Sequence, residues 1–343
     1  MDWTVLIFKT IFLIIILLIT LVIAMYSTYG ERKVAAFMQD RRGPNRAGPF
    51  GLLQPLADGL KMFMKEDIIP LTANKTLFIL GPAIAMSIAL LTGAVIPWGG
   101  TITIGGREFS LQIADLNIGI LYVFAMVSIG VYGIMIGGWA SNNKYALLGS
   151  IRAASQMISY ELAMGMSIIA LILTTGTLSL HDIVAQQQGA HWNVFYQPLG
   201  FLIFIICAFA ETNRAPFDLP ECETELIGGY HTEYSSMKLG FYLFSEYVNM
   251  FISSAVIATL YFGGYNMPFI GRLGLSPNVL TLLGMAFLFI KIFGLIFLFM
   301  WIRWTLPRFR YDQLMNLGWK GLIPLAMFNI VATGLYYYFF ELT

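Results

Sequence analysis

Long apolar runs alternate with shorter polar segments along all 343 residues of the chain. A helix needs about 20 predominantly apolar residues to cross a bilayer. Eight runs come close to this length, so the pattern predicts an all-α fold, a polytopic transmembrane helix bundle of about eight spans. The fifth run is short and ends in charge, so we expect it to be tilted or re-entrant. The expected spans are residues 4–28, 77–97, 116–139, 157–178, 196–212, 239–263, 281–304 and 321–340.

The polar segment after the first span, residues 29–76, contains a different helical pattern. Gly-Pro pairs indicate turns in its first half, and from Leu53 onward apolar residues recur at helical spacing. This pattern predicts an amphipathic helix in the membrane interface. Two roles fit it: a simple surface anchor, or a docking face for another protein and the rim of a site for an amphiphilic ligand. Its apolar face would carry Leu53, Leu56, Leu60 and Met64, and its polar face Gln54, Asp58, Lys61 and Lys65.

The other connections give weaker predictions. Residues 98–115 fit a short hairpin followed by a turn, and residues 179–195 carry His181 and His191. Without a third ligand nearby, these histidines are expected to be solvated rather than to bind a metal. We find no internal repeat and no disordered linker, so we expect a single integral-membrane domain over residues 1–343. The first run is too long for a signal peptide, which favours a retained span.

Composition agrees with a membrane protein, because 58% of residues are hydrophobic, 11% are charged and the mean hydropathy is +0.73. The placement of Lys and Arg predicts the orientation, since basic residues gather in cytoplasmic loops. Sixteen of the twenty basic residues fall in four alternate connections. Both termini are therefore expected to face outward. The four basic connections are residues 29–76, 140–156, 213–238 and 303–320.

Few ionisable residues fall within the expected spans. Glu161 would lie just inside the inner end of the fourth, Glu246 further along the sixth, and Lys291 near the middle of the seventh. An ionisable group inside a membrane is expensive, so each is a candidate functional residue. The alternative for each is one half of a buried ion pair that fixes helix packing.

Acidic residues concentrate between residues 211 and 247, where seven of the chain's nineteen occur. Asp218 and Glu221 fit a capping box at the start of a helix, but that leaves the others unexplained. Crowded, partly buried carboxylates raise one another's pKa. Such a cluster can hold or pass protons near neutral pH, so we predict a proton relay. The seven are Glu211, Asp218, Glu221, Glu223, Glu225, Glu233 and Glu246.

Several cofactor motifs do not occur in the sequence. There is no dinucleotide-binding or P-loop fingerprint, no cysteine set for an iron–sulfur cluster and no histidine pair in the spans for haem. The two cysteines, Cys207 and Cys222, form no ligand cluster. If the chain takes part in redox chemistry, a partner must supply the electrons. The chain itself would supply a site for a lipid-soluble acceptor and a route for protons.

Four segments on the expected inner loops carry a family resemblance. They are similar to the quinone-site membrane subunit of respiratory complex I, which is the H subunit of NADH-quinone oxidoreductase in bacteria and NADH dehydrogenase subunit 1 in mitochondria. The likeness covers essentially the whole chain. The segments are ERKVAAFMQDRRGPNRAGPFGLLQPLADGLKMFMKE (31–66), GWASNNKYALLGSIRAASQMISYE (138–161), ETNRAPFDLPECETEL (211–226) and PRFRYDQLMNLGWK (307–320).

The resemblance implies site residues of two kinds. One set would form a proton path from the quinone cavity into the membrane: Glu161, Glu211, Asp218, Glu221, Glu223, Glu225 and Glu246. The other would lie at or near the quinone entrance and the face toward the hydrophilic arm: Arg32, Arg41, Arg42, Arg46, Gln54, Asp58, Lys61, Phe217 and Glu233.

The resemblance also implies what the chain binds and where it works. Quinone would be a substrate, with no metal, haem, flavin or iron–sulfur cluster bound by this chain. Partners would be other membrane-arm and peripheral-arm subunits, including the one bearing the terminal iron–sulfur cluster, and membrane lipid, but no nucleic acid. The location would be the bacterial inner membrane, or the mitochondrial inner membrane in an organelle.

Two departures from the family pattern accompany two alternative functions. Cys222 stands where relatives commonly have glycine, and the third span carries no carboxylate, so the relay's inner end would depend more on water or Tyr132. The same scaffold occurs in membrane-bound hydrogenases, which have no quinone. A stand-alone ion carrier is a third possibility, although many carriers show the inverted repeats that are missing here.

Overall fold

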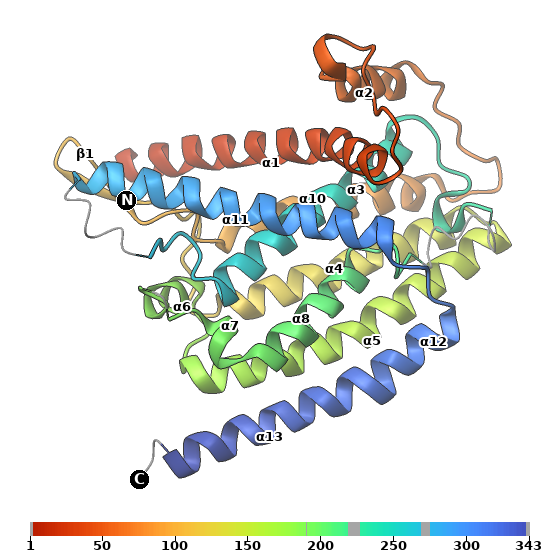
Figure 1. The fold of residues 1–343 in the computed structure, drawn as a ribbon. Helices are drawn as coiled ribbons and strands as arrows, with labels where there is room; N and C mark the ends of the chain where they lie inside the picture. Colours follow the sequence, from red (N-terminus) through yellow and green to blue (C-terminus); the bar gives the residue numbers. More distant parts are fainter. Residues whose placement is uncertain (1–2, 190, 219–226, 269–274, 341–343) are drawn as a thin grey trace.

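The computed structural model describes residues 3–189, 191–218, 227–268 and 275–340. Within them, seven helices are long and apolar enough to cross a membrane, which confirms an all-α, polytopic bundle. Both termini lie at the same end of the bundle (Figure 1). The seven are α1 (Trp3–Met38), α3 (Lys75–Thr92), α4 (Gly119–Ala140), α5 (Lys144–Thr175), α10 (Ser236–Tyr261), α11 (Pro277–Thr305) and the continuous helix made of α12 (Tyr311–Asn316), the π-helical turn η5 (Leu317–Leu322) and α13 (Ile323–Phe340).

The fifth expected span is the exception. Helix α8 (Pro198–Glu211) has only 14 residues. At 1.5 Å per residue it is about 21 Å long, less than the roughly 30 Å of a hydrocarbon core. The connections α6 (Leu180–Gln186) and α7 (Asn193–Tyr196) precede it. As the sequence indicated, this run does not form an ordinary span.

Two helices extend well beyond their apolar runs. Helix α1 continues to Met38 and α5 begins at Lys144, so the expected ends at residues 28 and 157 are wrong. Hydropathy marks only the part of a helix that suits a bilayer. The added turns are stabilised by tertiary contacts: Gln156 Nε2, for example, donates to the carbonyls of Ala210 at 2.8 Å and Phe217 at 2.7 Å.

Two smaller expected elements are also present. The amphipathic helix is α2 (Gln54–Met64), with Pro55 in its first turn, where its missing N–H costs nothing. The expected hairpin is formed by the antiparallel strands β1 (Thr101–Ile104) and β2 (Arg107–Ser110). Short 3-10 turns complete the described elements: η1 (Pro49–Gly51), η2 (Gly93–Val95) and η3 (Gly229–His231).

Helix α10 is the central helix of the bundle, since 67% of its apolar stretch is buried, more than in any other of these spans. It packs against α4 through two glycines. A Cβ on Gly137 would lie 1.9 Å from the Tyr242 hydroxyl oxygen, and the Tyr242 hydroxyl donates to the Gly133 carbonyl at 3.0 Å. Small residues four apart let membrane helices approach closely. This contact fixes the position of the first turns of α10.

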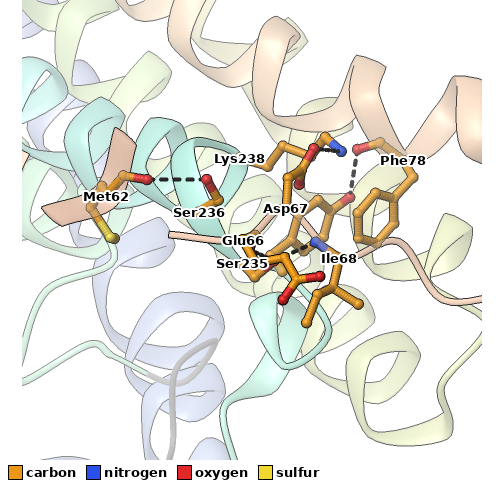
Figure 2. A network of polar contacts seen from close by, with 9 residues as sticks. Met62, Glu66, Asp67, Ile68, Phe78, Ser235, Ser236 and Lys238 are labelled. Carbon is orange, nitrogen blue, oxygen red and sulfur yellow. Dashed lines mark hydrogen bonds and ion pairs between the residues drawn. The ribbon is translucent and has the colours of Figure 1, made fainter. Parts of the chain in front are cut away.

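A group of polar contacts, which we name the α2–α10 latch, ties the end of α2 to the start of α10 (Figure 2). Ser236 Oγ donates to the Met62 carbonyl at 3.0 Å, and the Ile68 amide donates to Ser235 Oγ at 3.0 Å. Lys238 Nζ contacts Asp67 Oδ2 at 2.7 Å. The amphipathic helix is therefore attached directly to the central helix.

Candidate functional site

Three of the expected relay carboxylates lie inside the bundle, on three different helices. Glu211 is the last residue of α8, and Glu246 lies ten residues after the start of α10, about 15 Å along it. Glu161 lies near the middle of α5, seventeen residues after Lys144. The expectation that it sits just inside the end of a span is wrong, because α5 starts before its apolar run.

A polar cavity of about 630 Å³ has both Glu211 and Glu246 in its wall. The Tyr230 hydroxyl lies 3.5 Å from Glu246 Oε1. Hydroxyl and amide groups around such a space can hold ordered water, which makes about three hydrogen bonds where it is buried. A proton can pass along a chain of such groups between the two carboxylates. The remaining polar lining consists of Thr92, Thr212, Asn213, Tyr242, Ser245, Asn249 and Ser253.

A second, mostly apolar cavity of about 480 Å³ also has Glu211 in its wall. Its lining is largely aliphatic and aromatic and reaches as far as Leu180 on α6 and Leu260 near the end of α10. Apolar walls favour a dry cavity, whereas polar walls favour water. Glu211 therefore stands at the boundary between a space suited to water and one that is not.

Glu161 is linked to the same region through α4. Its carboxylate is hydrogen-bonded to the Ser128 side chain and lies within electrostatic range of Glu211. Its second oxygen, Oε1, is buried and has no hydrogen-bond partner among the described residues. A buried acceptor is normally satisfied, so this oxygen is suited to a water or a bound proton. By contrast, Tyr132 is 57% exposed and does not line either cavity, so the expectation that it continues the relay is wrong.

Sequence analysis missed a buried ionic cluster next to this path. Glu31, on α1, is 5% exposed and contacts Arg214 at 2.6 Å and Arg303 at 2.6 Å. The Arg214 guanidinium lies 3.9 Å from the centre of the Tyr247 ring and within electrostatic range of Glu246. Four segments of the chain meet here: α1, the loop after α8, α10 and α11. The available signal was an acidic residue directly after a long apolar run.

The environment of Arg214 favours its charged form. Burial by itself would lower the pKa of this guanidinium, but Tyr247 and the Glu31 carboxylate raise it, and the net shift is upward. Arg214 is 3% exposed, so its charge is screened little by solvent. It therefore acts as a fixed positive charge beside the polar cavity.

The structure brings three of the expected quinone-entrance residues together. Arg32 Nη1 contacts Asp58 Oδ2 at 2.7 Å, and Gln54 Nε2 donates to Asp58 Oδ1 at 3.0 Å. This entrance cluster, Arg32–Gln54–Asp58, joins the end of α1 to the polar face of α2. The other basic residues of the segment are on the surface: Arg41, Arg42, Arg46 and Lys61.

Two other residues of that set lie apart from the entrance cluster. Phe217 is buried, with its ring against those of Tyr160 and Phe309, and belongs to the packing beneath the loop after α8. Glu233 accepts a hydrogen bond of 2.6 Å from Asn143 Nδ2, which joins the start of α5 to the loop before α10.

The rest of the acidic loop is only partly described. Asp218 Oδ2 contacts Arg308 at 3.2 Å, on the segment that joins α11 to α12. Asp218 therefore has a basic partner rather than a place in the wall of either cavity. The expected relay residues Glu221, Glu223 and Glu225, together with Cys222, lie outside the described residues.

Lys291 is held by backbone carbonyls. Its ammonium donates to the carbonyls of Phe262 and Gly264, both at 2.6 Å, and of Asn266 at 3.1 Å. The expected alternative of an ion pair is therefore not what the described residues show. They also contain no group of three or more potential metal ligands, and His191 contacts the Tyr196 hydroxyl at 2.9 Å.

The fold and this site define the class of protein: a polytopic membrane protein with acidic and basic groups buried between its spans. The chain belongs to the NADH dehydrogenase family, whose model matches residues 10–334.

Relatives are similar to the chain over nearly their full length. The first of two numbered H subunits of NADH-quinone oxidoreductase, from Cytophaga hutchinsonii, is 71% identical over 326 residues, which cover 95% of each chain. The H subunit of the same enzyme from Flavobacterium psychrophilum is 64% identical over 337 residues, 98% of each chain. The H subunit from Thermomicrobium roseum is 47% identical over 344 residues, 98% of this chain and 97% of that one.

Proposed function

We propose that this chain is the membrane subunit of a proton-translocating NADH:quinone oxidoreductase, and that it couples quinone reduction to proton movement. It forms the membrane part of the quinone cavity and has no redox centre of its own. NADH oxidation, the flavin and the iron–sulfur clusters belong to partner subunits. The whole chain acts as one integral-membrane unit in a bacterial inner membrane, with both termini on the outer side.

The carboxylates Glu161, Glu211 and Glu246 carry the proton in this proposal. The observation that supports it is the polar cavity shared by Glu211 and Glu246, lined by hydroxyl and amide side chains. Carboxylates separated by hydrated polar groups can exchange protons through water. The fixed charge of Arg214 beside Glu246 stabilises the ionised form of that carboxylate and so helps to keep it ready to accept a proton.

The entrance cluster has a different role in the proposal. Arg32, Gln54 and Asp58 present charged and amide groups beside the amphipathic helix, where a quinone headgroup can meet polar atoms and its tail can remain in lipid. The exposed basic residues Arg41, Arg42 and Arg46 face the peripheral arm, and the subunit bearing the terminal iron–sulfur cluster supplies the electrons.

A test compares Glu211→Gln and Glu246→Gln with Glu108→Gln in the complete complex. Glutamine keeps the size of the side chain but cannot release a proton. We expect normal assembly on a native gel in all three, and loss of most inhibitor-sensitive quinone reduction and pumping in the first two. Glu108 lies exposed on β2, so its variant should behave as wild type. Full pumping by Glu211→Gln and Glu246→Gln would reduce both residues to a packing role.

A further inference from the structure

Helix α10 ends at Tyr261, inside the protein, and its last carbonyls need hydrogen-bond donors. Side chains from other elements supply them. Gln187 Nε2 donates to the Thr259 carbonyl at 3.0 Å, and Asn193 Nδ2 donates to the Leu260 carbonyl at 2.8 Å. Lys291 then satisfies three carbonyls in the following turn. We name Gln187, Asn193, Lys291 and the backbone of residues 258–266 the α10 plug.

Lys291 anchors this plug from deep within the bundle. It lies fourteen residues from either end of α11, which is about 21 Å from each. A charged side chain at such a depth is costly unless its hydrogen bonds are satisfied. Three carbonyls accept from Lys291 Nζ, matching the three N–H groups of an ammonium, and the Phe287 ring lies 4.4 Å from it. The contacts therefore specify the charged form.

The plug stands at one end of the apolar cavity, and Glu211 stands at the other. Leu260, whose carbonyl is bound by Asn193, is in the cavity wall, as is Leu180 at the start of α6. Helix α6 is itself part of the same contact, because Asn266 Nδ2 donates to the Val184 carbonyl. If this end opened to water, the Glu211 carboxylate would face a second aqueous phase.

We propose that the α10 plug is a proton seal. It closes the apolar cavity against the solution beyond α10, so that Glu211 exchanges protons only through the polar cavity. The ammonium of Lys291 adds an electrostatic barrier, because a fixed positive charge in a narrow path repels protons and other cations. This inference rests on the proposed role of Glu211 in proton transfer and adds the reason that the transfer has one direction of access.

The test measures passive proton leak in vesicles that contain the complete complex, without NADH. An imposed pH difference should decay several-fold faster with Lys291→Ala than with wild type. The matched control is Lys9→Ala, since Lys9 also donates to a backbone carbonyl, that of Ile113 at 3.1 Å, but lies on α1 and lines neither cavity. Lys9→Ala should leak no faster than wild type.

A double variant tests the route. Adding Glu211→Gln to Lys291→Ala should return the leak to the wild-type rate, because the opened path ends at Glu211. A wild-type leak in assembled Lys291→Ala overturns the seal, and so does a leak that persists without the Glu211 carboxylate. If Lys291→Ala fails to assemble, Asn266→Ala weakens the plug more mildly and is judged by the same two outcomes. Pumping by Glu211→Gln alone separately tests the proposed function.

Discussion

At the scale of single residues, the ionic cluster of Glu31, Arg214 and Arg303 is the feature with the largest expected effect on stability. Breaking a buried ion pair by removing one partner leaves an uncompensated charge, which costs about 3–5 kcal/mol. An exposed pair contributes only about 0–1 kcal/mol, because water screens it. The protein contains both kinds of pair, so the difference can be measured within one chain.

We expect Arg214→Leu to lower the melting temperature of the purified complex clearly, because Glu31 then keeps only Arg303 as a partner. The control is Arg310→Ala, which removes an exposed contact with Asp312. It should leave the melting temperature nearly unchanged. Equal melting temperatures for the two variants would show that the buried cluster adds no more stability than a surface pair.

At the scale of helices, the contact between α4 and α10 depends on the absence of side chains. A Cβ at Gly137 would overlap the Tyr242 hydroxyl, whereas a Cβ at Gly165 on α5 would meet nothing within 4 Å. We expect Gly137→Ala to displace the start of α10 and to reduce the amount of assembled complex on a native gel. Gly165→Ala should assemble as wild type. A normal yield of Gly137→Ala would mean that α10 can shift without loss of the fold.

The α2–α10 latch allows a second prediction about elements. Ser235→Ala removes the acceptor of the Ile68 amide, so this amide should exchange its hydrogen faster. Hydrogen exchange measured by mass spectrometry on peptides covering residues 65–74 gives the readout. Ser155→Ala, which removes only a bond to the Ile151 carbonyl on the same helix, is the control and should leave those peptides unchanged. Unaltered exchange in Ser235→Ala would show that other contacts hold the segment.

At the scale of the whole molecule, the bundle places charged groups from distant parts of the sequence around one path. Glu31 and Arg214 are 183 positions apart in the chain but 2.6 Å apart in space. Glu161, Glu211 and Glu246 come from three helices that meet beside the polar cavity. The proposed coupling requires this convergence, because a proton can move only between groups within reach of a common chain of water and hydroxyls.

Much of the candidate site could be predicted from residue type alone. A carboxylate inside an apolar run is costly, and this cost is enough to mark Glu161 and Glu246 as candidates. The pairing of Arg32 with Asp58 was not predictable in this way, because α1 and α2 are separated by turns whose path the pattern does not define. Likewise, Lys291 could be recognised as unusual, but not the carbonyls that it binds.

The sequence by itself determined that this is a polytopic helix bundle, where its spans lie and that it has an amphipathic interfacial helix. The physical reason is that a bilayer imposes length and hydropathy on each segment independently of the others. Only the tertiary structure decided where α1 and α5 end, that α8 is too short to span, and which charges meet. Those features depend on contacts between distant residues, such as Glu31 with Arg214, and no local pattern specifies them.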